Sequence, residues 1–380
     1  MSRFVSLLGH LPIAVGVGTI AVRAALGHGH APGDASLVEL GFLFLVILAC
    51  ASTASAAADR VAERLGEPYG TLVLTLSAIV IEVAMVAAVM LSGQGEDTVA
   101  RDTMFATLMI ILNLLVGVAL LVGGFRRGEQ TFNLQSSSSY LGLIIAFATV
   151  ALVLPRATDY EIGGFMTRRM EVLVALLTLA VYGTFLALQA SSYRSFFAHE
   201  RAGDHSVPAP ARMPHAGPVW PHAATLLAAL VVVVLLAESL GGTMVGVLDA
   251  HGLPSAISGV LVACLILGPE GVAAVKAARS DSMQRTMNIL LGSALSTIGL
   301  TVPAVLVLSM IVGQRVELGL DSSEICLLAG TLLVCVLNFG QGRTNPMQGI
   351  VHLVFFVGYL VLIFDVHPGE VGGPVGPSTP

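Results

Sequence analysis

Charged residues are scarce in this chain, and polar segments long enough to form a soluble domain are missing. Only 11% of the 380 residues are charged, whereas 55% are apolar and the mean hydropathy is +0.87. A typical soluble domain carries about 25% charged residues. The longest polar stretch covers only about residues 191–219. The composition therefore excludes a water-soluble globular fold and indicates a protein embedded in a lipid bilayer.

Cysteine is also rare, and its placement argues against a disulfide framework or a cysteine-based metal centre. All four cysteines fall inside apolar stretches, and no two of them form a CxxC pair. We interpret them as buried thiols, which behave as small apolar side chains. Nothing in the sequence calls for a resident cofactor. The four positions are Cys50, Cys264, Cys326 and Cys335.

Long apolar runs fill almost the whole chain. A membrane-spanning helix needs about 20 such residues, so the sequence predicts an all-α polytopic membrane protein with about eleven transmembrane helices. The first run resembles a signal peptide, but Arg23 is a poor neighbour for cleavage after Ala25, and we interpret the run as a span. The predicted spans are 8–26, 37–58, 70–92, 103–124, 138–155, 171–190, 221–246, 254–275, 287–312, 323–340 and 347–365.

The basic residues predict an orientation. With the N-terminus in the cytoplasm, the external loops hold Arg23, Arg101, Arg156, Arg168, Arg169 and Arg315, and the cytoplasmic segments hold the other 12 of the 18 basic residues. This bias favours a cytoplasmic N-terminus and an external C-terminus. The loop with Arg156, Arg168 and Arg169 is the exception. We expect an integral protein of the bacterial inner membrane.

Ten of the spans form two sets of five after the first is set aside. Because five is odd, the second set must cross the membrane in the opposite sense, which is the inverted-repeat plan of many secondary transporters. The expected organisation is a first helix and loop at 1–36, a five-helix repeat at 37–190, a cytoplasmic linker at 191–220, a second five-helix repeat at 221–366 and a disordered tail at 367–380.

Two isolated glutamates are the strongest indication of function. Glu82 is the only charge in Thr71–Leu91, and Glu270 is the only charge in Leu253–Val275. A charge at this depth costs roughly 2.5–3.5 kcal/mol on insertion scales, so such residues usually face a cavity and handle ions or protons. Each glutamate lies in the second span of its repeat. We therefore expect one midplane cation site built from both repeats; the structural alternative is a buried carboxyl that joins two helices.

Other polar residues accompany the glutamates. The third span of the first repeat carries Asn113, and that of the second repeat carries Ser293 and Ser296. Ser77 precedes Glu82. Asn113 could equally join two helices by a hydrogen bond, and the serines could bond to their own backbone.

A proline stands immediately before Glu270. Because Gly268-Pro269 interrupts the run of backbone donors, we expect α-helical structure to break or kink there and to free carbonyl oxygens, Gly268 included, as ligands.

These residues carry a resemblance to the calcium/cation antiporter superfamily, and within it to the bacterial ChaA-type branch of CAX-like cation/proton exchangers. The similar segments are Gly66–Gly70 followed by Leu74–Glu82, Leu267–Gly271 followed by Asn288 and Gly292-Ser293, and Gly342–Asn345. The resemblance implies an α-helical antiporter that exchanges cytoplasmic Ca²⁺, or Na⁺ or K⁺, for protons. It also implies that Asn113 matches a family asparagine. Glu238 resembles a glutamate at the start of the family's second repeat, either a proton relay or an interfacial charge.

The chain departs from the family at the site itself. The wider family has Gly-Asn-x-x-Glu at both glutamates, but here Ala78-Ile79 take the first two positions before Glu82, and Leu267-Gly268-Pro269 precede Glu270. Both amide ligands of calcium are therefore missing, whereas both carboxyl groups that can bind protons are present.

The chemistry follows from the residue types. Ca²⁺ prefers six to eight oxygen ligands, which carboxylates, Asn113, hydroxyls, carbonyls and water could supply. Two adjacent carboxylates resist joint ionisation, so protons and the cation compete for one site. Alternating access of that site gives exchange without a chemical reaction.

The rival functions are a monovalent cation/proton antiporter, a cation channel and a polytopic membrane enzyme. An enzyme would need a nucleophile–base pair or a histidine-rich cluster, and the only mid-span histidine candidate, His352, has no partner motif. We expect no enzymatic activity. The expected partners are the lipid bilayer, inorganic cations and protons, with no nucleic acid; a homo-oligomer is compatible with such a chain.

Overall fold

The computed structural model describes residues 2–26, 36–66, 69–91, 98–158, 166–190 and 218–365. Most of the predicted cytoplasmic linker and all of the predicted tail at 367–380 lie outside these residues. Within them the chain is helical apart from turns and one pair of two-residue strands, β1 (Gln130–Thr131) and β2 (Arg343–Thr344). The predicted all-α membrane fold is confirmed.

The helices follow the predicted order of spans. Three of the long segments are α-helices interrupted by a π-helical stretch, labelled η. The elements are α1 (Ser2–Leu26), α2 (Leu37–Leu65), α3 (Tyr69–Leu91), α4 (Val99–Met109), η1 (Ile110–Leu115), α5 (Val116–Arg127), α6 (Leu134–Ala148), η2 (Thr149–Val153), α7 (Leu154–Thr158), α8 (Arg168–Ala190), α10 (Trp220–His251), α11 (Ala256–Arg279), α12 (Met283–Ser296), η3 (Thr297–Thr301), α13 (Val302–Val312), α14 (Ser322–Phe339) and α15 (Pro346–Asp365).

Ten helical segments of the described chain are long and apolar enough to cross a bilayer. Five precede residue 191 and five follow residue 219. In both sets the third segment contains a π-helix, η1 in the first and η3 in the second. The first predicted span is helical as α1, but its apolar part, His10–Ala25, is shorter than the other ten.

Contacts between chain turns show that successive segments run in alternating directions. At one end of the bundle Arg101, at the start of α4, lies 3.1 Å from Glu317, in the turn before α14. At the other end β1 pairs with β2, and the Gln130 amide donates to the Ala278 carbonyl near the end of α11 (3.2 Å). The turns thus gather in two layers, as expected of helices that cross one slab.

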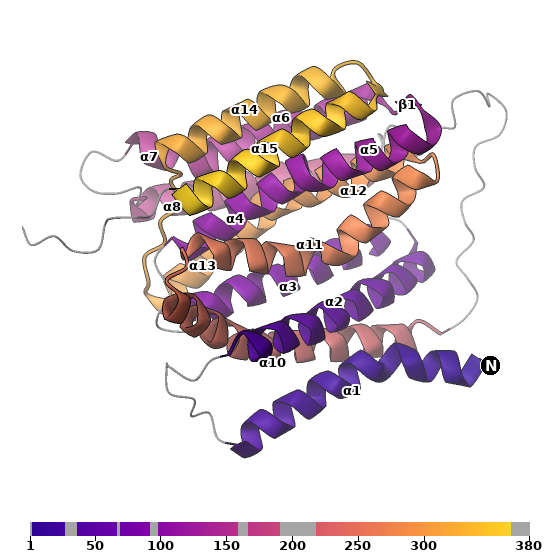
Figure 1. Ribbon diagram of the computed structural model, residues 1–380, viewed down its shortest axis with the longest axis vertical. Coiled ribbons are helices and arrows are strands. Elements are labelled where there is room, and N and C mark those ends of the chain that lie inside the picture. Colours follow the sequence, from indigo (N-terminus) through magenta and orange to yellow (C-terminus); the bar gives the residue numbers. More distant parts are fainter. Residues whose placement is uncertain are drawn as a thin grey trace, which may run out of the picture.

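The bundle has two apolar cores. One is built mainly by α2, α3 and α10, and the other by the remaining long segments around α4–η1–α5 and α12–η3–α13. Figure 1 shows α2 and α10 side by side, with α1 outermost on that side and α14 and α15 on the opposite side. α3 and α11, the two helices with the isolated glutamates, lie between these groups (Figure 1).

Small residues allow two segments of the larger core to touch through their backbones. A Cβ atom on Gly349 of α15 would lie 2.7 Å from the Gly117 carbonyl of α5, and one on Gly117 would lie 3.0 Å from the Gly349 carbonyl. Such close approach is the usual way in which membrane helices gain packing energy, because lipid supplies no hydrophobic drive between them.

Several helices are longer than hydropathy predicts. The second predicted span ends at residue 58, but α2 continues to Leu65; the seventh ends at 246, but α10 continues to His251. Hydropathy drops at the first charged residues, whereas backbone hydrogen bonding continues into water as long as the side chains tolerate a helix. The predicted spans therefore end several residues before the helices do, at the end where charged residues begin.

The expectation that the helix breaks at Gly268-Pro269 is wrong. α11 is α-helical from Ala256 to Arg279, with Pro269 inside it. Proline removes only one helical donor, and a bend relieves the clash with the preceding turn. Figure 1 shows α11 changing direction part-way along its length, which agrees with the kink that was the alternative expectation.

Prolines instead coincide with two of the π-helical stretches. Pro155 lies two residues after η2, and Pro303 lies two residues after η3. Each proline cannot donate to the carbonyl four residues earlier, which lies within the π-helix, so widening of that turn relieves the mismatch. η1 has no such proline, and no sequence signal marks it.

Candidate ion-binding site

Glu82 lies on α3 and is buried, with 3% of its surface exposed. Its Oε2 atom accepts hydrogen bonds from the Thr301 hydroxyl (2.7 Å) and the Thr297 hydroxyl (3.3 Å). Its Oε1 atom is buried without a hydrogen-bond partner in the described chain. A buried carboxyl oxygen in this state is costly unless it binds a proton or a cation, so Glu82 has the environment of a binding group.

Glu270 lies on α11, one residue after Pro269, and is half-buried. Its Oε2 atom accepts a hydrogen bond from the Ser293 hydroxyl of α12. Ser293, predicted as an ion ligand, thus bonds to Glu270 itself, and its role as a ligand stays a prediction. The contact holds the carboxyl group against the segment that also carries the partners of Glu82.

One polar face of α12–η3 connects the two glutamates. Ser293, Thr297 and Thr301 are spaced four residues apart, and so they lie roughly along one side of the segment. The first donates to Glu270 and the other two donate to Glu82. A carboxyl group from the first set of five helices thus meets hydroxyl groups from the second set.

Both carboxyl groups contact successive hydroxyls of one segment, so negative charges on both of them would repel each other. A cation between them, or a proton on one of them, removes that repulsion. The described chain has no group of three or more His, Cys, Asp or Glu side chains that could hold a metal ion permanently.

Asn113 lies in η1 and is fully buried. Its amide nitrogen donates to the Thr331 hydroxyl of α14 (3.0 Å) and lies 3.5 Å from the Met109 sulfur, while its Oδ1 atom has no partner among the described residues. These contacts join two helices and do not reach either glutamate. The role of Asn113 as an ion ligand stays a prediction.

The other predicted ligands are Ser77, Ser296 and Gly268. Ser77 donates to the Val73 carbonyl (2.6 Å) and Ser296 to the Ser293 carbonyl (2.9 Å), so both hydroxyls bond to their own helices. Gly268 packs against α2, because a Cβ atom there would lie 2.7 Å from Leu48. Their roles as ligands are likewise predictions.

Among the described residues, Glu238 and His352 make no hydrogen bond with the two carboxyl groups. Glu238 is exposed on α10, and its role as a proton relay remains a prediction. His352 is fully buried on α15; its Nε2 atom lies 3.2 Å from the Asn338 amide nitrogen, and its ring stacks on Phe339. These contacts explain His352 as a packed core residue.

Thr297 and Thr301 were not predicted as site residues from the sequence. Both are hydroxyl-bearing residues in an apolar span, and their four-residue spacing from Ser293 was the available signal. The α-helical spacing alone did not predict which neighbour they would meet.

Comparison with known proteins agrees with this geometry. The family model described as "Sodium/calcium exchanger protein" matches residues 35–191 and 221–364, which include both glutamates and α12–η3. The chain belongs to this family. The resemblance inferred from the sequence is confirmed, and the protein is an integral membrane transporter of the exchanger type and not an enzyme.

Relatives with assigned ions differ in the ion that they carry. The chain is 36% identical to the sodium-potassium/proton antiporter ChaA of Escherichia coli (strain K12), over 86% of this chain and 89% of that protein. It is 24% identical to a Ca²⁺/H⁺ antiporter of Synechocystis sp. (strain ATCC 27184 / PCC 6803 / Kazusa), over 85% and 90%.

A solved structure with the same fold is that of native YfkE. Its TM-score with this chain is 0.72 at 19% identity, and the match covers 94% of this chain and 99% of the other. The exchanger family and its fold are therefore shown. The relatives do not agree on the exchanged ion.

Proposed function

We propose that this protein is a cation/proton antiporter that exchanges Na⁺ or K⁺ for protons at a site formed by Glu82 and Glu270. The observation that carries the proposal is the pairing of these two carboxyl groups along the hydroxyl face of α12–η3. Protonated, the pair is neutral and holds a cation weakly. Deprotonated, it is negative, so the proton and the cation exclude each other.

Two features favour a monovalent ion over the Ca²⁺ expected from the sequence. The residues that contact the glutamates are three hydroxyls, and both amide positions of the wider family's motif are occupied by residues without polar side chains. The relative at 36% identity is named for sodium and potassium. A site with few oxygen ligands suits a monovalent ion better than an ion that requires six to eight.

Ca²⁺ is the second candidate, and one observation favours it. Two carboxylates that interact electrostatically supply two negative charges, which match a divalent ion. Two more distant relatives, at 24% and 25% identity, are named as Ca²⁺/H⁺ antiporters and match 85% of this chain. Ion competition in a single assay separates the two candidates.

The test is cation flux in inverted membrane vesicles under an imposed pH gradient, with Na⁺, K⁺ and Ca²⁺ compared. We expect Na⁺ or K⁺ to dissipate the gradient. The apparent affinity for that cation should fall about tenfold for each unit by which the pH is lowered, where one proton competes for the site. Vesicles without the protein are the control. An affinity independent of pH would refute a shared site, and flux of Ca²⁺ alone would favour the second candidate.

We also propose that the protein lies in the bacterial inner membrane with the β1–β2 end in the cytoplasm. The support is the excess of basic residues in the segments at that end, among them Arg126, Arg127 and Arg343. At the opposite end Arg156 and Arg168, two of the exceptions in the sequence, are held in ion pairs with Asp321 and Glu171.

Single cysteines test this orientation. In a background with the four native cysteines replaced, Ser323→Cys should react with a membrane-impermeant thiol reagent on intact cells, and Arg127→Cys should not. Both positions are exposed, and they lie at opposite ends of the bundle. Both should react after the membrane is permeabilised, which is the control. The reverse pattern would invert the protein in the membrane.

A further inference from the structure

A pocket of about 780 Å³ lies between α11 and the η1–α5 segment, away from the hydroxyl face that binds the glutamates. Its walls are mostly apolar, with Ile110, Leu115, Leu267 and Val272 among them, and Val272 is 71% exposed. Glu270, which contacts Ser293, is not among its lining residues. Gly268 and Gly271, which flank Glu270 in sequence, belong to the lining, but the carboxyl groups do not, and the exposed Val272 shows that the pocket is open to the outside.

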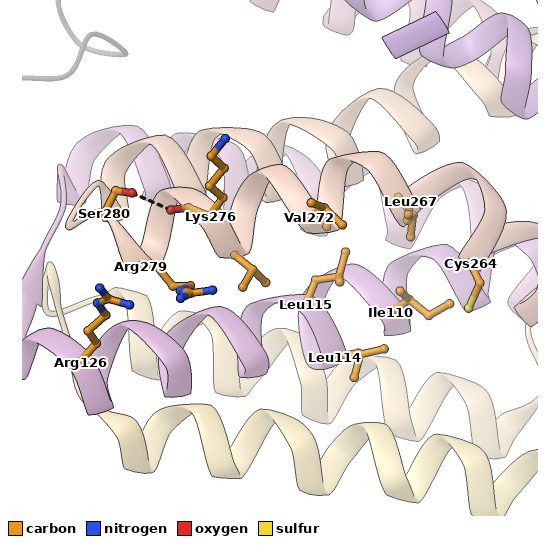
Figure 2. Close-up of a pocket in the computed structure, with 13 residues that line it drawn as sticks. Ile110, Leu114, Leu115, Arg126, Cys264, Leu267, Val272, Lys276, Arg279 and Ser280 are labelled. Carbon is orange, nitrogen blue, oxygen red and sulfur yellow. Dashed lines mark hydrogen bonds between the residues drawn. The ribbon is translucent and has the colours of Figure 1, made fainter. Parts of the chain in front are cut away.

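Basic side chains gather at one end of this pocket. Figure 2 shows Arg126 of α5 and Arg279 of α11 at the same end, with Cys264 at the other end; Lys276, also a lining residue, extends from α11 away from the two arginines. None of these three cations forms an ion pair within the described part of the chain. Two guanidinium groups without an acidic partner are suited to bind a phosphate.

The positive charge argues against a route for the transported ion. A cation approaching through this opening would meet Arg126, Lys276 and Arg279 before any carboxylate, and like charges repel. The site instead attracts anions, and its apolar walls favour an anion with a hydrocarbon part.

The dimensions fit one leaflet of a bilayer. Lys276 and Cys264 are twelve residues apart on α11, a distance of about 18 Å along a helix. One leaflet contributes about 15 Å, half of the hydrocarbon core. A groove with cations at the end of the helix and apolar walls of this depth matches the shape of a phospholipid.

We propose that this groove binds one anionic phospholipid, with the phosphate at Arg126 and Arg279 and an acyl chain against Leu115 and Val272. Basic pockets between membrane helices are known to attract anionic headgroups. The lipid would bridge α11, which carries Glu270, and η1, which carries Asn113. The inference does not depend on which ion the protein exchanges.

Lipid retention on the purified full-length protein tests the proposal. Native mass spectrometry would compare phosphatidylglycerol with phosphatidylcholine of the same acyl chains. We expect the wild type to retain phosphatidylglycerol selectively, and the double variant Arg126→Gln/Arg279→Gln to lose at least about tenfold in retention, since each cation contributes about fivefold. Val272→Trp, which fills the groove and leaves the charges intact, should also reduce retention.

The matched control is Arg127→Gln/Arg285→Gln. It removes the same charge from exposed positions at the same end of the bundle, neither of which lines the groove. Retention should be unchanged there. Equal losses in both double variants, equal retention of phosphatidylcholine, or unchanged retention in Val272→Trp would each overturn the proposal. Displacement of the lipid by excess inorganic phosphate would reduce the groove to a simple anion site and would overturn it as well.

Discussion

Glu82→Gln and Glu270→Gln should each abolish cation exchange while leaving insertion and folding intact. Glutamine keeps the size of the side chain and can still accept from Thr301 or Ser293, but it cannot become a carboxylate. The remaining glutamate alone cannot switch between a neutral and a doubly negative pair. The measurement is flux in inverted vesicles, with protein amount and elution profile as checks of folding.

The matched control for this experiment is Glu63→Gln, which removes a carboxyl group from an exposed position on α2. Its flux should equal that of the wild type. Thr301→Val should have an intermediate effect, because Glu82 keeps its charge and its contact with Thr297. Near-normal flux in either Glu82→Gln or Glu270→Gln would end the two-carboxylate mechanism.

Arg101→Gln should destabilise the fold by about 3–5 kcal/mol, the cost of leaving buried acidic groups without their cation. Arg101 is 10% exposed and lies 3.0 Å from Asp102 and 3.1 Å from Glu317. It also approaches the capping box of α14, in which Asp321 and Glu324 cap each other's backbone groups. The measurement is the thermal midpoint of the purified protein in detergent.

Arg156→Gln is the graded comparison for Arg101→Gln. Arg156 contacts the same acidic cluster through Asp321 (3.2 Å), but it is 37% exposed. Water replaces much of what an exposed cation contributes, so we expect a loss of at most about 1 kcal/mol. A loss as large as that of Arg101→Gln would contradict the assignment of Arg101 as the central cation.

The pH dependence of the Arg101→Gln variant has a definite sign. Glu317 lies in the turn between α13 and α14, and burial raises the pKa of its carboxyl above the ordinary 4.5, while Arg101 opposes this shift. A raised pKa in the folded state means that stability is complete below the unfolded value and is lost as pH rises through the folded value. The deficit of the variant should therefore shrink as pH falls towards about 4.5 and be largest at neutral pH. A deficit independent of pH would show that packing, not charge, is lost.

Much of the fold was predictable because a bilayer imposes simple constraints. The apolar runs and the scarcity of charge determined an all-α membrane protein, since only helices and closed barrels satisfy their backbone groups in lipid. The matching depths of Glu82 and Glu270 in the two sets of five spans indicated an exchanger. The sequence also singled out Ser293 as a polar residue of the span that follows Glu270, but not its hydrogen bond with Glu270.

Only the tertiary structure decided how the site is assembled. Hydropathy contains no information on rotation about a helix axis, so it could not show that Thr297 and Thr301 face Glu82, whereas Asn113 faces Thr331. It also could not show that Pro269 leaves α11 helical while Pro303 follows a π-helix, because the packing around each proline decides how the lost hydrogen bond is absorbed. The sequence by itself determined the membrane fold and the two isolated glutamates within its spans, because both follow from local composition. The hydroxyls that bind them and the basic groove of Arg126 and Arg279 depend on contacts between distant segments, which only packing brings together.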